Sequence, residues 1–171
     1  MDSGYRVKHH EMLDVVIRSY LVRLNGGYPA IVQKFYSSGK ADIQPCFKVA
    51  YVNPDDGSIE TPDPPIVTNV PVLYSISVIG GRISGHVYPL SPGQEVWCQV
   101  SQRSLETYLN SGGVVDPADT RMFDLSDSVI IAGIRPDNHP LPDINTSKML
   151  IGFLDGNGLI QIDTSGNVKI D

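Results

Sequence analysis

The sequence is short of cysteine, tryptophan and aromatic residues in general, and it lacks a long apolar run. Its 171 residues include two cysteines, one tryptophan and 8% aromatic residues. Cys46 and Cys98 form no CxxC pair, which excludes a disulfide scaffold and a cysteine zinc site. We expect both to be buried thiols of a protein made in a reducing cytoplasm. No segment approaches the roughly 20 apolar residues that span a bilayer, and the first residues lack the apolar core of a signal peptide.

Positive charge is also scarce. Thirteen basic residues against nineteen acidic ones give a net charge of -6 and a pI of about 5.0. A protein that neutralises many phosphates normally has a basic excess, so general nucleic-acid binding is disfavoured. The low aromatic content likewise disfavours an oligonucleotide-binding surface, which stacks bases on exposed aromatic rings.

What the chain has instead is glycine, proline and β-branched residues. There are 16 glycines and 13 prolines, and isoleucine and valine together far outnumber leucine. β-Branched side chains suit a pleated surface, and glycine and proline mark turns. The composition therefore predicts a mainly β protein of one domain, or of one domain plus a small appendage.

Residues 9–24 are the clearest helical segment. Asn25-Gly-Gly27 predicts the end of the helix, because asparagine and glycine accept the left-handed conformation of a helix C-cap. The amphipathic stripe must be covered by the chain's own domain or by a partner. Its apolar residues recur at i, i+3, i+4, i+7, i+8 and i+11, and they are Leu13, Val16, Ile17, Tyr20, Leu21 and Leu24.

Short strands between turn signals follow, over residues 28–136. Seven candidate strands, with a helix over 104–110 before the last of them, fit a small closed barrel of the OB type with five or six strands. The expected strands are 30–36, 41–52, 66–69, 72–79, 82–87, 94–100 and 128–134.

After a proline-containing linker, 137–147, residues 148–171 form a β-tail. Two turns, Asp155-Gly-Asn-Gly158 and Asp163-Thr-Ser-Gly-Asn167, separate three apolar runs. Three short strands are not stable alone and leave bare edges, so we expect them to pair with copies of the chain around a threefold axis. The predicted trimerising residues are Leu150, Ile151, Phe153, Leu154, Leu159, Ile160, Ile162, Val168 and Ile170.

The histidines and the first tail turn do not form a metal-binding pattern. His9 and His10 are adjacent, whereas two ligands on one helix face are three or four residues apart. The tail turn that begins at Asp155 has glycine at position 166, where a calcium loop of the EF-hand type has glutamate. We therefore predict a hairpin turn there, no metal site and no cofactor.

One loop carries carboxylates that could in principle act as an acid/base pair. Asp124 and Asp127 lie between Arg121 and Arg135, but no nucleophile, oxyanion hole or phosphate-binding loop accompanies them. We predict that this loop caps the barrel: its Asp and Ser side chains bond to backbone amides and its arginines pair with carboxylates. No catalytic residue is predicted, and the protein is not expected to be an enzyme.

Several motifs resemble a known family. These are Pro45-Cys-Phe-Lys-Val49 with the later run 64–72, the turn and strand 88–96, the helix 104–113, and above all the run from Pro117 through Arg121-Met-Phe-Asp-Leu-Ser-Asp127 to Arg135-Pro136. They are similar to the OB-domain central spike proteins in the baseplates of contractile-tailed bacteriophages, Mu-like and related. The departures look like packing variations: Tyr108, Phe123 and Ala132 stand where the family often has Trp, His and Pro.

The resemblance implies an intertwined homotrimer with a β-helix or β-prism-like tail. Such a spike docks on the hub at the end of the tail tube, and sheath contraction drives it through the host outer membrane. The apolar stripe of residues 9–24 would then contact the hub or a second protomer. The family's tip iron is bound by a His-x-His pair, which this sequence lacks, so we expect a short stub or a separate tip protein. The protein would be assembled in the bacterial cytoplasm and reside in the virion.

Two alternatives stay open at this point. The same part could serve a tailocin or a type VI-like injection device. From a different class, the chain could be a carbohydrate-binding or wall-degrading OB module, since two carboxylates facing a cleft cannot be recognised from spacing alone. The spike interpretation depends on the long motif at 117–136 more than on the fold.

Overall fold

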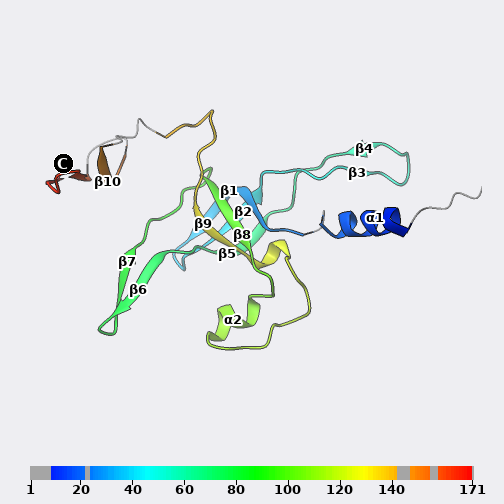
Figure 1. The fold of residues 1–171 in the computed structure, drawn as a ribbon, viewed down its shortest axis with the longest axis horizontal. Helices are drawn as coiled ribbons and strands as arrows, with labels where there is room; N and C mark the ends of the chain where they lie inside the picture. The colour runs from blue at the N-terminus through cyan, green and yellow to red at the C-terminus, as the bar shows by residue number, and fades with distance from the viewer. Residues whose placement is uncertain (1–8, 22–23, 142–146, 155–157, 171) are drawn as a thin grey trace, which may run out of the picture. The chain divides into compact units, whose positions relative to one another are not determined.

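A computed structural model describes residues 9–21, 24–141, 147–154 and 158–170 (Figure 1). The chain divides into two compact units, Met1–Ile134 and Arg135–Asp171. Both are built mainly from antiparallel β-structure. The N-terminal helix α1 spans His9–Leu21, and Leu24, predicted as its last residue, is not helical.

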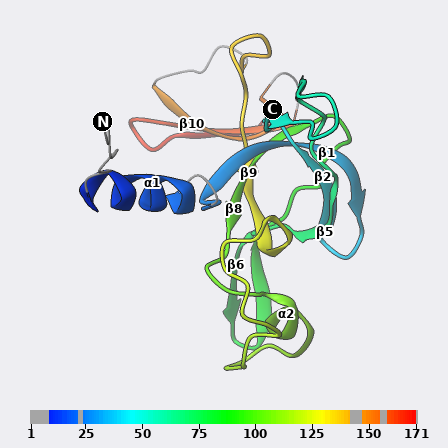
Figure 2. The same ribbon diagram turned by 90° about the vertical axis from the view of Figure 1, so that its right-hand side faces the viewer.

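The first unit is organised around a five-stranded sheet with the order β5-β2-β1-β8-β9. All four neighbouring pairs are antiparallel, and the sheet curls into a half-barrel (Figure 2). Val72, just beyond β5, forms a parallel bridge with Ile130 of β9, and the Leu73 N–H donates to the Ile130 carbonyl at 2.7 Å. The two ends of the sheet therefore meet. The strands are β1 (Gly27–Tyr36), β2 (Lys40–Pro45), β5 (Val67–Pro71), β8 (Glu95–Val100) and β9 (Ser128–Gly133).

The core lies on the concave side of this sheet. Every second residue of β2 and β8 is buried, as a period of two requires when one face of a strand is covered. The Tyr28 hydroxyl is hydrogen-bonded to Ser128 Oγ at 2.8 Å, and burial raises the pKa of Tyr28 to about 12. The buried apolar residues are Tyr28, Ala30, Val32, Ala41, Ile43, Val70, Leu90, Val96, Cys98, Val100 and Ile130.

The single strand predicted at 41–52 is wrong. Strand β2 ends at Pro45, and a separate two-residue strand β3 (Tyr51–Val52) pairs with β4 (Ile59–Glu60). The cause is the turn 53–57, which folds the chain back on itself at once: the Gly57 N–H donates to the Asn53 carbonyl at 2.9 Å. The small hairpin takes these residues out of the barrel.

The strand predicted at 72–79 is likewise interrupted. Val72 and Leu73 contact β9, and β6 (Ser75–Ile79) then pairs with β7 (Arg82–His86) in a hairpin closed by Gly80 and Gly81. Both glycines have positive φ, 56° and 77°, which side chains rarely adopt. All ten residues of this hairpin are exposed.

The prediction of two buried thiols holds for one cysteine only. Cys98 is fully buried in β8, and desolvation raises the pKa of its thiol to about 12. Cys46 is exposed, so its predicted burial is wrong. The reason is local: Cys46 follows the last residue of β2, where the chain leaves the core.

The connection from β8 to β9 is held by one buried carboxylate. It contains helix α2 (Glu106–Ser111) and a 3-10 turn, Leu125–Asp127. The Asp127 side chain is 3% exposed and accepts from Arg121 Nε at 2.7 Å and from the Leu105 N–H at 2.8 Å. Arg121 also donates to Ser104 Oγ at 3.0 Å, and its bond to Asp127 raises the pKa of the guanidinium. The pairing of Arg121 with a carboxylate was predicted from the sequence; the bond from Asp127 back to Leu105, which ties both ends of the connection together, was not.

The second unit is a three-stranded antiparallel meander with the order β10-β11-β12. Its strands are β10 (Lys148–Gly152), β11 (Leu159–Asp163) and β12 (Val168–Ile170). Asp163 closes the second turn: its carboxylate accepts from the backbone N–H of Ser165 and Asn167, each at 2.9 Å, and from the Asn167 side chain. These bonds lower the pKa of Asp163, and the bond with the Asn167 side chain has the largest effect. The first turn, 155–157, lies outside the described residues.

We expect Ile43→Ala to lower the free energy of unfolding by about 2–4 kcal/mol, because it leaves a cavity beside β1 and β5. The matched control is Ile83→Ala in the exposed hairpin, where Ile83 is 77% exposed, and it should change stability by about 0.5 kcal/mol or less. Urea denaturation of the full chain, followed by circular dichroism, measures both. Equal effects would contradict a core centred on this sheet.

Asp127→Ala should destabilise the chain by about 3 kcal/mol, because it removes the buried carboxylate that accepts from the part-buried Leu105 N–H and from Arg121. Asp119→Ala is the control: Asp119 also accepts from Arg121, at 2.9 Å, but its side chain is 45% exposed. An exposed ion pair contributes about 1 kcal/mol or less. Urea denaturation and limited proteolysis of the connection report the difference. A similar loss in both variants would show that burial of Asp127 is not what matters.

Candidate functional site

The apolar stripe of α1 is uncovered. Each of the six side chains predicted to contact a hub or protomer is at least half exposed, with Val16 at 53% and Tyr20 at 77%. Two charged residues, Asp14 and Arg18, form an ion pair at 2.8 Å beside the stripe. The stripe therefore does not pack on the chain's own barrel in this structure.

An open apolar hollow lies where the chain passes from α1 into the barrel. It has a volume of about 260 Å³ and is lined by Tyr20, Leu24, Met122 and Phe123. The Asn25 side chain donates to the Phe123 carbonyl at 2.9 Å, which ties the start of the barrel to this loop. Phe123 has a φ of +53°, an unusual conformation for a large residue. Backbone strain of this kind is maintained only where surrounding contacts impose it.

The C-terminal sheet has one entirely apolar face. Directly opposed residues of an antiparallel pair point to the same side, and the register pairs Ile162 with Met149 on one strand and with Val168 on the other. The same face continues through Ile160, which is opposite Ile151 and Ile170. Four of the six side chains are more than a third exposed: Met149 60%, Ile160 37%, Val168 62% and Ile170 76%.

The opposite face of this sheet is mostly polar. Lys148 and Asp163 are directly opposed, as are Gln161 and Lys169. Lys148 Nζ donates to Gln161 Oε1 at 3.0 Å. The unit is therefore a thin, two-faced sheet with one side suited to water and one to a hydrophobic contact.

The structure groups the residues of the predicted trimerising set differently from the sequence analysis. Ile151, Ile160, Ile162, Val168 and Ile170 share the apolar face. Leu150 and Leu159 are on the other face, and Phe153 and Leu154 follow β10. Met149 belongs to the apolar face but is absent from that set; the alternation that starts at Lys148 could have identified it.

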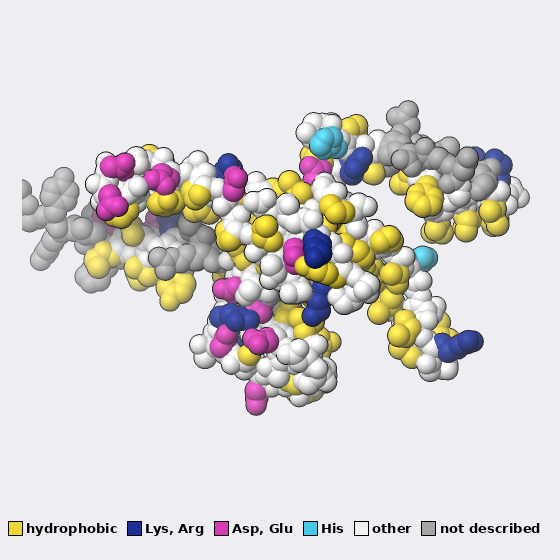
Figure 3. Space-filling model, turned by 180° about the vertical axis from the view of Figure 1, so that it is seen from behind, with side chains coloured by type: hydrophobic (Ala, Val, Ile, Leu, Met, Phe, Trp, Pro, Cys, Tyr) yellow, Lys and Arg dark blue, Asp and Glu magenta, His cyan; other side chains and the backbone are white. Residues whose placement is uncertain are grey.

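Two further apolar surfaces, the β6–β7 hairpin and a hollow beside α2, contain none of the contact residues predicted from the sequence. The β6–β7 hairpin exposes Ile76, Val78 and Ile83, which its register places on one face. Figure 3 shows hydrophobic side chains along this hairpin and along one side of the C-terminal unit. Gly85 is required in the hairpin, because a Cβ there would collide with the Ser75 carbonyl oxygen.

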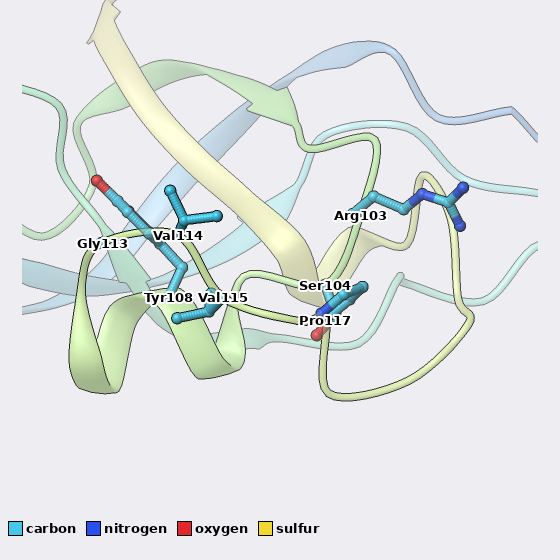
Figure 4. A pocket seen from close by; sticks show the side chains of 7 residues that line it. All are labelled: Arg103, Ser104, Tyr108, Gly113, Val114, Val115 and Pro117. Atoms are coloured by element: carbon cyan, nitrogen blue, oxygen red, sulfur yellow. The ribbon is translucent and has the colours of Figure 1, made fainter.

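A hollow of about 330 Å³ lies beside α2 (Figure 4), lined by Arg103, Ser104, Tyr108, Gly113, Val114, Val115 and Pro117. Its lining includes no carboxylate and no histidine. The Arg103 guanidinium extends away from Tyr108 and Val114 (Figure 4). The surface of this hollow therefore offers an apolar contact rather than an acid/base pair.

The carboxylates considered as an acid/base pair are engaged in structural bonds. Asp124 accepts from the Ser126 N–H at 2.9 Å and from Ser126 Oγ at 2.6 Å, which lowers its pKa. Asp127 is held by Arg121 and Leu105, as described above. Among the described residues no group of three His, Cys, Asp or Glu side chains could hold a metal ion. In that part of the chain no helix is long and apolar enough to cross a membrane.

Comparison with protein-family models gives a match. The family model described as the phage protein Gp138 N-terminal domain matches residues 28–133, from the second residue of β1 to the last residue of β9. No curated protein matches the chain. The matched segment is well over half of the sequence and covers the half-barrel with its two hairpins and the α2 connection. The chain therefore belongs to the family of phage proteins that contain the Gp138 N-terminal domain.

Proposed function

We propose that this phage protein is a structural component of the tail baseplate, the central spike that docks on the hub at the end of the tail tube. Three copies would form the spike, and sheath contraction would drive it through the host outer membrane. The phage family match and the similarity of residues 117–136 to the spike motif support a structural role in a phage particle. The observation that carries the proposal is the uncovered apolar face of the C-terminal sheet.

Three copies of this sheet can enclose a common dry interior. Each would turn the face of Met149, Ile151, Ile160, Ile162, Val168 and Ile170 inward. Full burial of such a side chain contributes about 1.5–3 kcal/mol. The polar face with Lys148 and Asp163 would stay in water. In a prism of three such sheets, the apolar faces would be buried inside and the polar faces would stay in contact with water.

The edges of the same sheet support this arrangement. Strand β10 and strand β12 are the outer strands of the meander. Each has one neighbour in the sheet, and pairing with a strand of the neighbouring copy would give it a second. Continuous pairing between chains resists bending, which a device that transmits force along its axis needs.

The mechanism would be mechanical. The barrels would hold the spike on the hub, the C-terminal sheets would form its shaft, and a separate tip protein could extend it. No cofactor and no catalytic residue take part in this proposal. The partners would be two further copies of the chain, the hub protein and, transiently, the outer membrane.

Ile162→Asp tests the apolar face, because Ile162 is at its centre between Met149 and Val168. Sedimentation of the full chain should show a trimer for the unchanged protein and a monomer, or a much weaker trimer, for the variant. Gln161→Asp, on the opposite face of the same strand, is the control and should remain trimeric. A chain that ends at Pro142 should behave like Ile162→Asp. A tight trimer in either would place the main interface in the first unit, Met1–Ile134, and not in the C-terminal sheet.

Antibody against the full chain should place the protein in the particle. Gold-labelled antibody viewed by electron microscopy on virions of the encoding phage should mark the centre of the baseplate. Label on the head, or on the sheath alone, would overturn the proposal. The purified chain should also release no dye from labelled peptidoglycan; release above that of a heat-inactivated sample would favour a wall-degrading module instead.

A further inference from the structure

The apolar side chains of α1 follow the spacing of a coiled-coil seam. Leu13, Ile17 and Tyr20 are separated by four and three residues. This 4-3 spacing averages 3.5 residues, the repeat with which one helix keeps contact along another. This spacing is compatible with packing along a partner helix.

The stripe is wider than a two-helix seam. At 100° per residue, Val16, Tyr20, Leu13, Ile17 and Leu21 occupy an arc of about 140°, and every one of them is at least half exposed. A pairwise seam needs only its two central positions, whereas a helix that contacts two neighbours buries the flanking positions too. The charged residues Asp14 and Arg18 lie just outside the arc and bond to each other. The width therefore fits a helix with two helical neighbours.

Helix α1 also needs such a contact in order to persist. It has 13 residues, a length at which isolated helices are marginal in water. Its sequence includes the β-branched Val15, Val16 and Ile17, which lower helix propensity. Packing must supply the stability that local preference does not.

We propose that α1 packs against the α1 helices of two further copies in a parallel three-helix bundle on the axis of the trimer. This inference rests on the proposed trimer, which brings three identical unpartnered stripes into one particle. The hollow lined by Tyr20, Leu24, Met122 and Phe123 lies at the foot of the helix, where an apolar side chain of a neighbouring copy can enter. The sequence analysis left the hub and a second protomer as possible partners of the stripe. In the proposed bundle the stripe contacts other protomers and not the hub.

Cysteine cross-linking of the full chain tests the bundle. In a Cys46→Ser background, which removes the exposed native thiol, Leu13→Cys places a thiol on the seam. Val15→Cys is the matched control, because Val15 is about as exposed as Leu13 (66% and 61%) but points to the opposite side of the helix. After mild oxidation, Leu13→Cys should give covalent dimers that hold up to about two thirds of the chains, since one thiol of each threefold set is left over. Val15→Cys should stay mostly monomeric on a denaturing gel.

Sedimentation of the same samples separates this inference from the proposed function. A trimer with efficient cross-linking at position 13 alone supports the bundle. A trimer in which position 13 cross-links no better than position 15 overturns the bundle and leaves the spike proposal standing. A chain that stays monomeric at every concentration overturns both.

Discussion

The pairing of β1 with β2 on one side and with β8 on the other is the interaction on which the barrel depends. Strand β1 has ten residues, the longest strand among the described residues, and β1 with its two neighbours supplies eight of the eleven buried apolar residues. The concave face is closed by small and β-branched side chains such as Ala30 and Val32, both fully buried. The core is therefore small, and many other apolar side chains of the described residues remain exposed.

Those remaining residues are concentrated on elements that extend beyond the barrel. Helix α1, the β6–β7 hairpin and one face of the C-terminal sheet all expose aliphatic side chains. Exposed apolar surface of this extent is typical of proteins that function in assemblies. The polar groups of the barrel, by contrast, are engaged in structural bonds such as Asp127 with Arg121.

Much of this was predictable from local patterns. The helix near residues 9–24, the glycine turn at Gly80, the strand that ends at Val100 and the arginine–carboxylate pairing in the loop before β9 all follow from periodicity or residue chemistry. The errors arose where a continuous apolar run crosses a boundary: 41–52 and 72–79 were each expected to be one strand, yet each divides between the barrel and a hairpin. An apolar run shows that residues prefer burial or pairing, but it does not show which sheet will accept them.

The amino-acid sequence by itself determined the β-rich class, the amphipathic helix and the three-stranded tail, because these depend on the spacing of neighbouring residues. Only the tertiary structure decided that Cys46 is exposed, that Val72 meets Ile130, and that Met149 joins Ile162 on one face while Leu150 and Leu159 do not. Such facts depend on strand register and on the contacts between residues far apart in the chain. A shift of one residue in register moves every side chain of a strand to the other face, and only the paired strands fix it.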